Sequence, residues 1–269
     1  MNQAVSHGLV LRVADHGESD KLATLFSPDL GRVSAIAKGA KRSKRRFVNK
    51  LEPFSLLEFT YKASRNSTLL LLNEAELEAA HLRLRQHYPA FLAASYLTEL
   101  LLKYTRDADP EPLLFALSLW ALQVLERGVP PLTILVLYHL RLLALVGYAP
   151  QIIACARCGQ TVSKGGVFHM PSGRVDLLCE ACSKSRPGPG CAFLPGSLRF
   201  LADGLTLPLD RLDRLRLQDV ETTTVLRALH RASQHLLQQD IHSWRALEEL
   251  FPARPTGSTQ GGTRCLSGR

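Results

Sequence analysis

Two Cys-x-x-Cys pairs constrain this chain more than any other feature of its sequence. Cys155 and Cys158 form the first pair, and Cys179 and Cys182 form the second after twenty intervening residues. Each pair can form a tight turn whose two sulfurs face one point, so four thiolates can surround a single metal ion. The spacing therefore predicts a structural Zn²⁺ site in which cysteine sulfur fills every position. Two disulfides and a thioredoxin-type redox pair are the alternatives.

The linker between the two pairs predicts a hairpin. Turn-forming residues at 163–166 and 171–173 flank a short run, Val167–Met170. Such a hairpin would cross between the two halves of the metal site. His169 lies in its middle and could compete as a ligand, although that position favours a surface residue.

Composition and the N-terminal sequence favour an intracellular protein. The chain has 269 residues, of which 46% are hydrophobic and 21% charged, as expected for a soluble protein with a sizeable core. No secretory signal is visible at the start, and in a reducing compartment paired cysteines hold metal more often than disulfides. The most apolar stretch, residues 131–148, contains His139 and Arg141, which favours a buried helix over a membrane span. We expect no membrane partner.

Positive charge is concentrated near the N-terminus. The net charge of the whole chain is +9, and residues 1–50 hold ten Lys or Arg against four Asp or Glu, a net +6. Six of these cations lie within residues 38–46, which contain no acidic residue. A solvated loop and a nuclear address are the ordinary explanations for a short basic run. The overall excess favours a polyanionic partner.

Alternating apolar residues predict five short strands within residues 8–73. Turn residues separate them, as at 15–17 and 27–31. Such a run of short strands is typical of a small closed barrel, and the OB-fold commonly pairs this barrel with a basic loop. OB-folds bind single strands through a basic groove and exposed aromatic residues. The candidate stacking residues are Phe47, Phe54 and Tyr61, although an aromatic residue in a strand more often belongs to the core.

Helical periodicity replaces the strand pattern from about Pro89. Apolar spacing predicts helices that include 97–104, 112–126 and 131–146, and after the cysteines 197–202 and two more, N-capped by Asp219 and Ser243. The earlier and later helices must share one core, because neither set buries enough surface alone. The expected fold is α+β and multidomain, with an OB-fold domain at 1–80, a helical domain at 81–150 and 191–251, an inserted zinc module at 151–190 and a disordered tail at 252–269.

Five segments carry the most distinctive motifs of the chain: Gly31–Val33, Ala37–Arg42, Leu51–Phe54, Tyr96–Leu100 and Leu140–Pro150. Together they resemble the RecO family of bacterial recombination mediators, over most of the chain up to about Leu250. Members of that family have an N-terminal OB-fold, a helical domain and, in many cases, a four-cysteine zinc module at this place. All four cysteines are kept here. The chain departs from the family at His139, where an acidic residue is expected.

The resemblance implies DNA binding without catalysis. The family binds single- and double-stranded DNA, anneals complementary strands and, with RecR, helps load RecA onto strands coated by single-stranded DNA-binding protein (SSB). The protein would then work at the nucleoid in the bacterial cytoplasm. A basic surface that binds two strands lowers the repulsion between their phosphates. The predicted phosphate contacts are Arg32, Lys38, Lys41, Arg42, Lys44, Arg45 and Arg46.

The resemblance also suggests that the helical domain binds the acidic C-terminal tail of SSB. Such a ligand needs an apolar pocket for its last side chain and a cation for its carboxylate. Residues 88–148 are rich in Leu, Phe and Trp, and Arg127 and Arg141 are the cations nearest to that apolar surface in sequence. Both side chains could instead simply reach water on their long stems.

Two other classes of protein compete with this interpretation. A nuclease would need clustered carboxylates for a metal pair, and no such motif, phosphate-cradling glycine loop or nucleophile triad is evident. A zinc-ribbon transcription factor should carry basic residues on its ribbon, yet the segment between the two cysteine pairs has only two Lys or Arg residues, Lys164 and Arg174.

Overall fold

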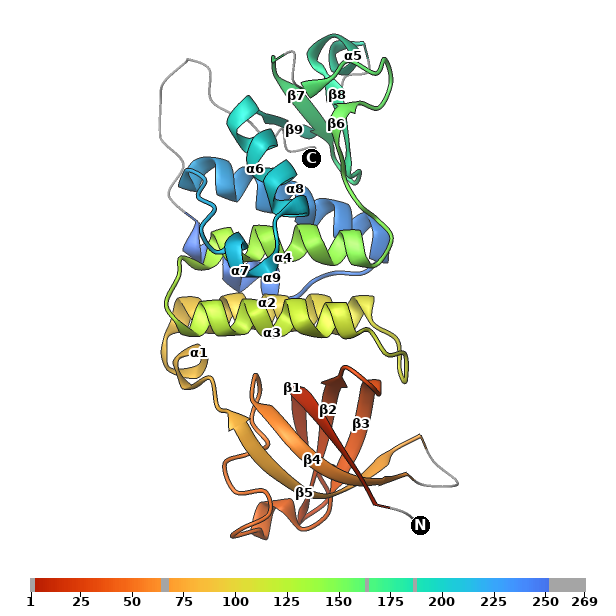
Figure 1. Cartoon of the computed structure of the whole chain (residues 1–269), viewed down its shortest axis with the longest axis vertical. Coiled ribbons are helices and arrows are strands. Elements are labelled where there is room, and N and C mark those ends of the chain that lie inside the picture. Colours follow the sequence, from red (N-terminus) through yellow and green to blue (C-terminus); the bar gives the residue numbers. More distant parts are fainter. Residues whose placement is uncertain (1–2, 64–67, 163–164, 186–187, 252–269) are drawn as a thin grey trace. The chain divides into compact units, whose positions relative to one another are not determined.

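The alternating apolar residues near the N-terminus form a closed barrel of five strands (Figure 1). The computed structural model describes residues 3–63, 68–162, 165–185 and 188–251. Around the barrel the order is β1-β2-β3-β5-β4, with β3 and β5 parallel and the other neighbours antiparallel. This topology confirms the predicted OB-fold. The strands are β1 (Ala4–His16), β2 (Asp20–Ser27), β3 (Gly31–Ala37), β4 (Leu56–Ala63) and β5 (Leu70–Ala79).

The barrel interior is filled by apolar side chains from every strand and by several from the segment between β3 and β4. Leu25, Leu57 and Leu72 are fully buried there, and Phe47 joins them from the segment between β3 and β4. Phe54 is also buried and packs edge-to-face on Phe91, with ring centroids 5.9 Å apart.

Phe47 and Phe54 therefore belong to the core, which is the alternative that the sequence favoured over stacking on bases. Phe47 is 3% exposed and Phe54 is 4% exposed. Tyr61 is half-buried and tilts against Phe59, with ring centroids 5.8 Å apart.

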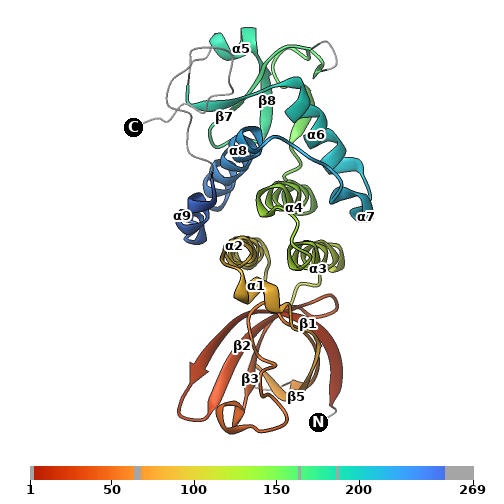
Figure 2. The same cartoon turned by 90° about the vertical axis from the view of Figure 1, so that its left-hand side faces the viewer.

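Three helices follow the barrel: α1 (Leu82–Gln86), α2 (Tyr88–Tyr104) and α3 (Pro112–Glu126). Prolines in the first turn of α2 and α3 fix where these helices begin. The two long helices lie side by side across one end of the barrel (Figure 2). Phe115 of α3 packs on Phe26 of β2, with ring centroids 6.1 Å apart. Barrel and helices thus form one compact unit, Met1–Arg127, whereas the expectation from the sequence was that these helices share a core with the later ones.

The second unit, Gly128–Arg269, is built around α4 (Pro131–Leu145). This helix is buried on most sides, and α6 (Pro195–Thr206) and α8 (Asp219–Leu237) pack against it. The helix expected behind Ser243 is α9 (Ser243–Leu247). The N-cap of α9 is His242 and that of α8 is Gln218, each one residue before the predicted Ser243 and Asp219. Also present are α7 (Leu209–Leu212) and a 3₁₀ turn at Glu248–Leu250.

No helix in the described part of the chain has the length and apolar character needed to cross a membrane. The predicted tail, residues 252–269, lies outside the described residues.

The second unit also contains a small sheet (Figure 1), and one cysteine of each pair ends a strand of it, Cys155 on β6 and Cys179 on β8. Its strand order is β6-β8-β7-β9, and the predicted hairpin is the antiparallel pair β7-β8. Phe168, Leu177 and Phe193 form its buried side. The strands are β6 (Gln151–Cys155), β7 (Phe168–Pro171), β8 (Asp176–Cys179) and β9 (Gly190–Phe193), and a short helix α5 (Glu180–Lys184) follows β8.

Candidate nucleic-acid interface and metal centre

The basic run, Lys38–Arg46, forms a loop directly after β3, and we call it the basic loop. Its second residue, Gly39, has a φ of +67°, which suits glycine, and a 3₁₀ turn follows at Ala40–Arg42. The Asp20 carboxylate accepts a hydrogen bond of 2.8 Å from the Gly39 backbone N–H, and this bond lowers the pKa of Asp20. A buried ring, Phe47, fixes the other end of the loop.

Four of the predicted phosphate contacts face solvent. Lys38, Arg42, Lys44 and Arg45 are exposed, and their side chains make no hydrogen bond or ion pair within the part of the chain that the structure describes. Contact with phosphate would break no hydrogen bond or ion pair of these four side chains among the described residues. They are therefore the best-placed cations for a polyanion.

The remaining two cations of the basic loop support its conformation. Lys41 pairs with Asp15 at 3.0 Å and donates to the Gly17 carbonyl at 3.0 Å. Arg46 donates to the carbonyls of Asn73 and Lys38, each at 3.2 Å. No sequence pattern indicated that Asp15 and Asp20 anchor the loop, because their position beside it depends on the pairing of the strands.

Arg32 lies on β3, apart from the basic loop, and its guanidinium is engaged. Nε donates to Asp107 Oδ1 at 2.7 Å, and Nη1 donates to the Leu102 carbonyl. The Arg32 carbonyl in turn accepts from the Ala108 N–H at 2.9 Å. These bonds join β3 to the segment between α2 and α3, so a phosphate contact by Arg32 would have to compete with them.

The four cysteines meet at one point of the small sheet. Cys155 ends β6 and Cys179 ends β8, while a turn at Gly159 and the helix α5 bring Cys158 and Cys182 back towards them. All four sulfur atoms lie within 4.8 Å of one another, and those of Cys158 and Cys179 are 3.7 Å apart. Sulfurs bound at about 2.3 Å to one tetrahedral zinc ion would be about 3.8 Å apart.

The electrostatics of the cluster suit a cation. Burial opposes ionisation of Cys155, but backbone N–H groups of Cys179, Cys158 and Arg157 lower its pKa to about 6. Burial and the neighbouring thiols raise the pKa of Cys182 to about 12. Thiols this close resist joint ionisation unless a metal ion balances the charge. His169 is half-buried on β7 and is not part of the cluster.

The residues expected to bind the SSB tail have different surroundings. Arg127 is exposed at the C-terminal end of α3. Arg141 is half-buried and donates from Nε to the Gly204 carbonyl at 2.5 Å and from Nη2 to the Leu207 carbonyl. It therefore satisfies carbonyl groups at the C-terminal end of α6.

His139 is fully buried on α4, with Nε2 2.6 Å from Ser233 Oγ. It faces α8 from inside the core of its unit. His139, where the sequence departs from the resembled family, therefore takes part in a buried hydrogen bond.

The fold and the two sites define a multidomain OB-fold protein with a solvent-facing basic loop and a four-cysteine module. Residues 1–81 match the family described as "Recombination protein O N terminal", and residues 85–245 match "Recombination protein O C terminal". The chain therefore belongs to the RecO family of DNA repair proteins.

Individual relatives agree with this assignment. The DNA repair protein RecO of Anaeromyxobacter dehalogenans (strain 2CP-1) is 37% identical over 76% of this chain and 81% of its own length. The protein of the same name from Desulfitobacterium hafniense (strain Y51) is 30% identical over 88% of this chain and 86% of its own length. The DNA repair protein RecO of Bacillus pumilus (strain SAFR-032) is 32% identical over 68% of this chain and 69% of its own length.

Proposed function

We propose that this protein is a non-enzymatic recombination mediator. It binds single- and double-stranded DNA, anneals complementary strands and, with RecR, helps load RecA onto strands coated by SSB. Family membership supports the pathway. The observation that carries DNA binding is the exposed part of the basic loop, formed by Lys38, Arg42, Lys44 and Arg45.

Charge neutralisation is the physical basis of this activity. Two complementary strands repel each other through their phosphates, and a cationic surface that holds both reduces this repulsion. Flexible, solvent-facing Lys and Arg side chains suit phosphates of any sequence. The exposed set on the basic loop should therefore contribute affinity without base preference.

The first prediction concerns the salt dependence of DNA binding. Each phosphate contact to a single strand adds about 0.7 to the slope of log affinity against log salt concentration. Replacing Lys38, Arg42, Lys44 and Arg45 together by Ala should flatten the slope by up to about three units and slow annealing. Fluorescence anisotropy with a labelled oligonucleotide over a salt series measures this.

A matched variant separates the loop from the overall charge. Arg199, Arg211, Arg214 and Arg245 are also exposed, and all belong to the second unit. Their joint replacement by Ala removes the same charge and should leave the slope nearly unchanged. A loop variant with the wild-type slope would contradict the proposal.

We also propose Arg127 and Arg141, each considered by itself, as contacts for the SSB tail, as the family resemblance suggests. Reversing the charge at Arg127 should weaken binding of a labelled tail peptide about tenfold, because a charge-assisted bond contributes roughly 1.5 kcal/mol or more. Arg245→Glu is the control, since it makes the same change at another exposed position. Arg141→Glu must be read together with thermal stability, because Arg141 also holds the end of α6. Unchanged affinity in the Arg127 variant would place the contact elsewhere.

We propose a structural Zn²⁺ as the ion of the four-cysteine site. The four sulfurs and their separation suit it, and no position remains for a substrate. A zinc-ribbon transcription factor has little support by comparison. Arg174, in the ribbon linker, is already paired with Asp176 at 2.6 Å.

A further inference from the structure

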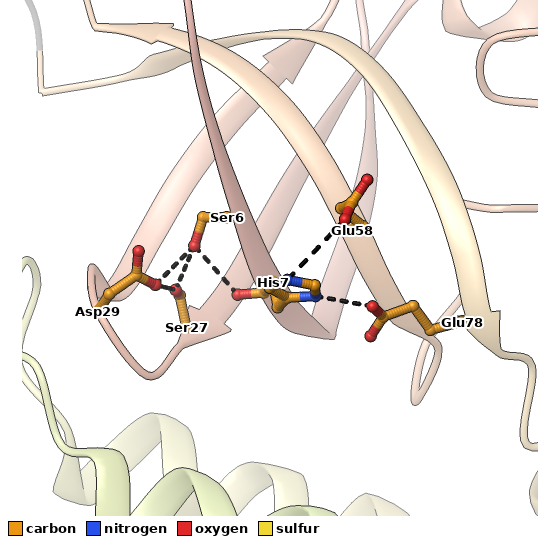
Figure 3. A network of polar contacts seen from close by, with 6 residues as sticks. All are labelled: Ser6, His7, Ser27, Asp29, Glu58 and Glu78. Atoms are coloured by element: carbon orange, nitrogen blue, oxygen red, sulfur yellow. Dashed lines mark hydrogen bonds and ion pairs between the residues drawn. The ribbon is translucent and has the colours of Figure 1, made fainter.

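A second group of metal-binding side chains lies on the outside of the barrel, and it belongs to neither site described above. His7, Glu58 and Glu78 project from β1, β4 and β5 towards one another (Figure 3). One donor atom from each residue lies within 4.8 Å of the others. His7 Nδ1 is 2.7 Å from Glu78 Oε1, and Nε2 is 3.9 Å from Glu58 Oε2.

Strand pairing fixes the positions of all three residues. His7 and Glu58 are direct partners in the β1-β4 pair. In the β4-β5 pair, Leu57 opposes Leu77 and Leu56 opposes Ala79, so Glu78 is the extra residue of a β-bulge. Bulges commonly redirect a side chain. Here the bulge residue is the one that meets the imidazole.

The backbone beside His7 is also held firmly. Its neighbour Ser6 points to the other side of β1, where Ser6 and Ser27 both donate to the Asp29 carboxylate, at 2.6 and 2.5 Å (Figure 3). The two serine oxygens are 2.8 Å apart. This network ties β1 to the end of β2, so the imidazole is presented from a fixed strand.

The charge balance on this face favours a cation. Glu58 pairs across the strands with Glu76, and Glu74 and Glu78 lie on the same strand as Glu76. Lys50 forms an ion pair with Glu76 at 3.0 Å. At the candidate site two carboxylates face a single imidazole, which leaves an excess of negative charge whether the ring is neutral or protonated. A divalent ion would remove that excess.

The donor set selects the type of ion. Mg²⁺ and Ca²⁺ prefer oxygen donors alone, whereas an imidazole nitrogen with two carboxylates suits Zn²⁺, Mn²⁺, Co²⁺ or Ni²⁺. Donors bound at about 2.1 Å to such an ion are about 3.0 to 3.4 Å apart. The His7 to Glu78 distance is near this range already. The ion would bind at His7 Nδ1, which already lies beside Glu78. Glu58 lies beside the other ring nitrogen, Nε2, and its half-exposed carboxylate would reach the same ion by turning to another rotamer.

We propose that His7, Glu58 and Glu78 form a second metal site, which binds a first-row divalent transition metal such as Zn²⁺ independently of the four cysteines. Three protein donors leave room for water or for an oxygen of another molecule on the same ion.

Zinc titration of the full chain tests this proposal. Protein whose cysteine site is already filled is titrated with Zn²⁺ in a calorimeter, and the bound metal is counted by elemental analysis. We expect one further equivalent in the wild type. His7→Gln and Glu78→Gln should each weaken it by about tenfold or more. Glu76→Gln is the matched control, because it removes a neighbouring carboxylate that already has Lys50 as its partner, and it should bind like the wild type.

Cobalt gives a second, spectroscopic measurement. Co²⁺ in the cysteine site shows sulfur-to-metal charge-transfer absorption, whereas Co²⁺ bound by imidazole and carboxylates does not. The second equivalent should therefore add only weak visible bands, and these should be lost in the His7 variant.

Two results would overturn the proposal. The first is a wild-type protein that takes up no second equivalent at about 100 µM free Zn²⁺, where a site with a Kd of about 1 µM is nearly full; the cluster is then only an ion pair. The second is a further equivalent that persists in His7→Gln, which places the metal elsewhere. Circular dichroism checks the fold of each variant, and Glu58→Gln carries the test if the His7 variant does not fold.

Discussion

At Gly31 two backbone segments of the first unit approach each other so closely that no side chain fits between them. An added Cβ would lie 2.2 Å from the Asp109 carbonyl oxygen, and the φ of Gly31 is +68°. The next residue, Arg32, bonds the same segment through both its side chain and its backbone. The family motif at these positions therefore fixes the α2–α3 connection on the barrel.

We predict that Gly31→Ala destabilises the first unit by more than about 3 kcal/mol, since backbone strain and a clash with backbone act together. Gly17→Ala is the matched control, because its φ is +58° and an added Cβ would meet nothing within 4 Å. It should cost only the strain, about 1 kcal/mol. Urea unfolding measures both. Equal losses of unfolding free energy in the two variants would show that the close approach of Gly31 to Asp109 adds no destabilisation.

Two buried histidines predict how stability depends on pH. Burial, with a smaller contribution from His230, lowers the pKa of His139 from 6.5 to about 3, and burial likewise lowers that of His230 to about 3. Between pH 6.5 and about pH 3 these histidines bind protons in the unfolded chain but not in the folded protein. The stability is therefore fully present above pH 6.5 and is lost as the pH falls towards 3.

At pH 5 this loss should be roughly 2 kcal/mol for each histidine. His139→Gln removes one of the two groups and should make urea unfolding of the second unit less dependent on pH between 6.5 and 4. His87→Gln, at an exposed position of the first unit, should leave that dependence unchanged. A His139 variant with the wild-type pH dependence would contradict the burial argument.

The cysteine module is an element too small to hold itself together by packing. Its strands have four or five residues each, and its buried side consists of two phenylalanine rings and a few other apolar side chains. Pieces of this size usually need a metal or disulfides.

We predict one zinc per chain at the cysteines, and loss of order over residues 151–185 when a chelator removes it. Hydrogen exchange should rise across β6 to β8 and stay low in the barrel. Cys158→Ser should behave like the chelated protein, and Arg157→Ala, a change within the same turn, like the wild type. A metal-free protein with unchanged exchange would refute this.

Elements with a strong period could be predicted from the sequence, and contacts between them could not. The helix spanning 112–126 has the predicted bounds because Pro112 marks its start and Gly128 and Pro130 follow its end. The last strand, β5, extends to Ala79, although only its start was expected, because Glu74, Glu76 and Glu78 make its second half look like polar surface. That second half supplies a residue of the proposed second metal site.

At the scale of the whole molecule, the four-cysteine cluster and the basic loop could be predicted because each is contiguous or regularly spaced. The structural roles of Arg32 and Arg141 could not, since their partners lie 63 to 75 residues away. An arginine in a sequence motif carries no sign of whether its partner is phosphate or a carbonyl group. Nor could the sequence show that residues 81–127 form one unit with the barrel, because that grouping depends on long-range packing such as that of Phe115 on Phe26.

The parallel pairing of β3 with β5 also sets the order in which the barrel can be completed during synthesis. The strands β1, β2 and β3 are joined by short turns and can pair as they leave the ribosome, whereas β5 is the last strand to appear and bonds to both β3 and β4. A nascent chain that stops before Leu70 therefore has two open sheet edges, the surfaces through which growing chains on one messenger can associate.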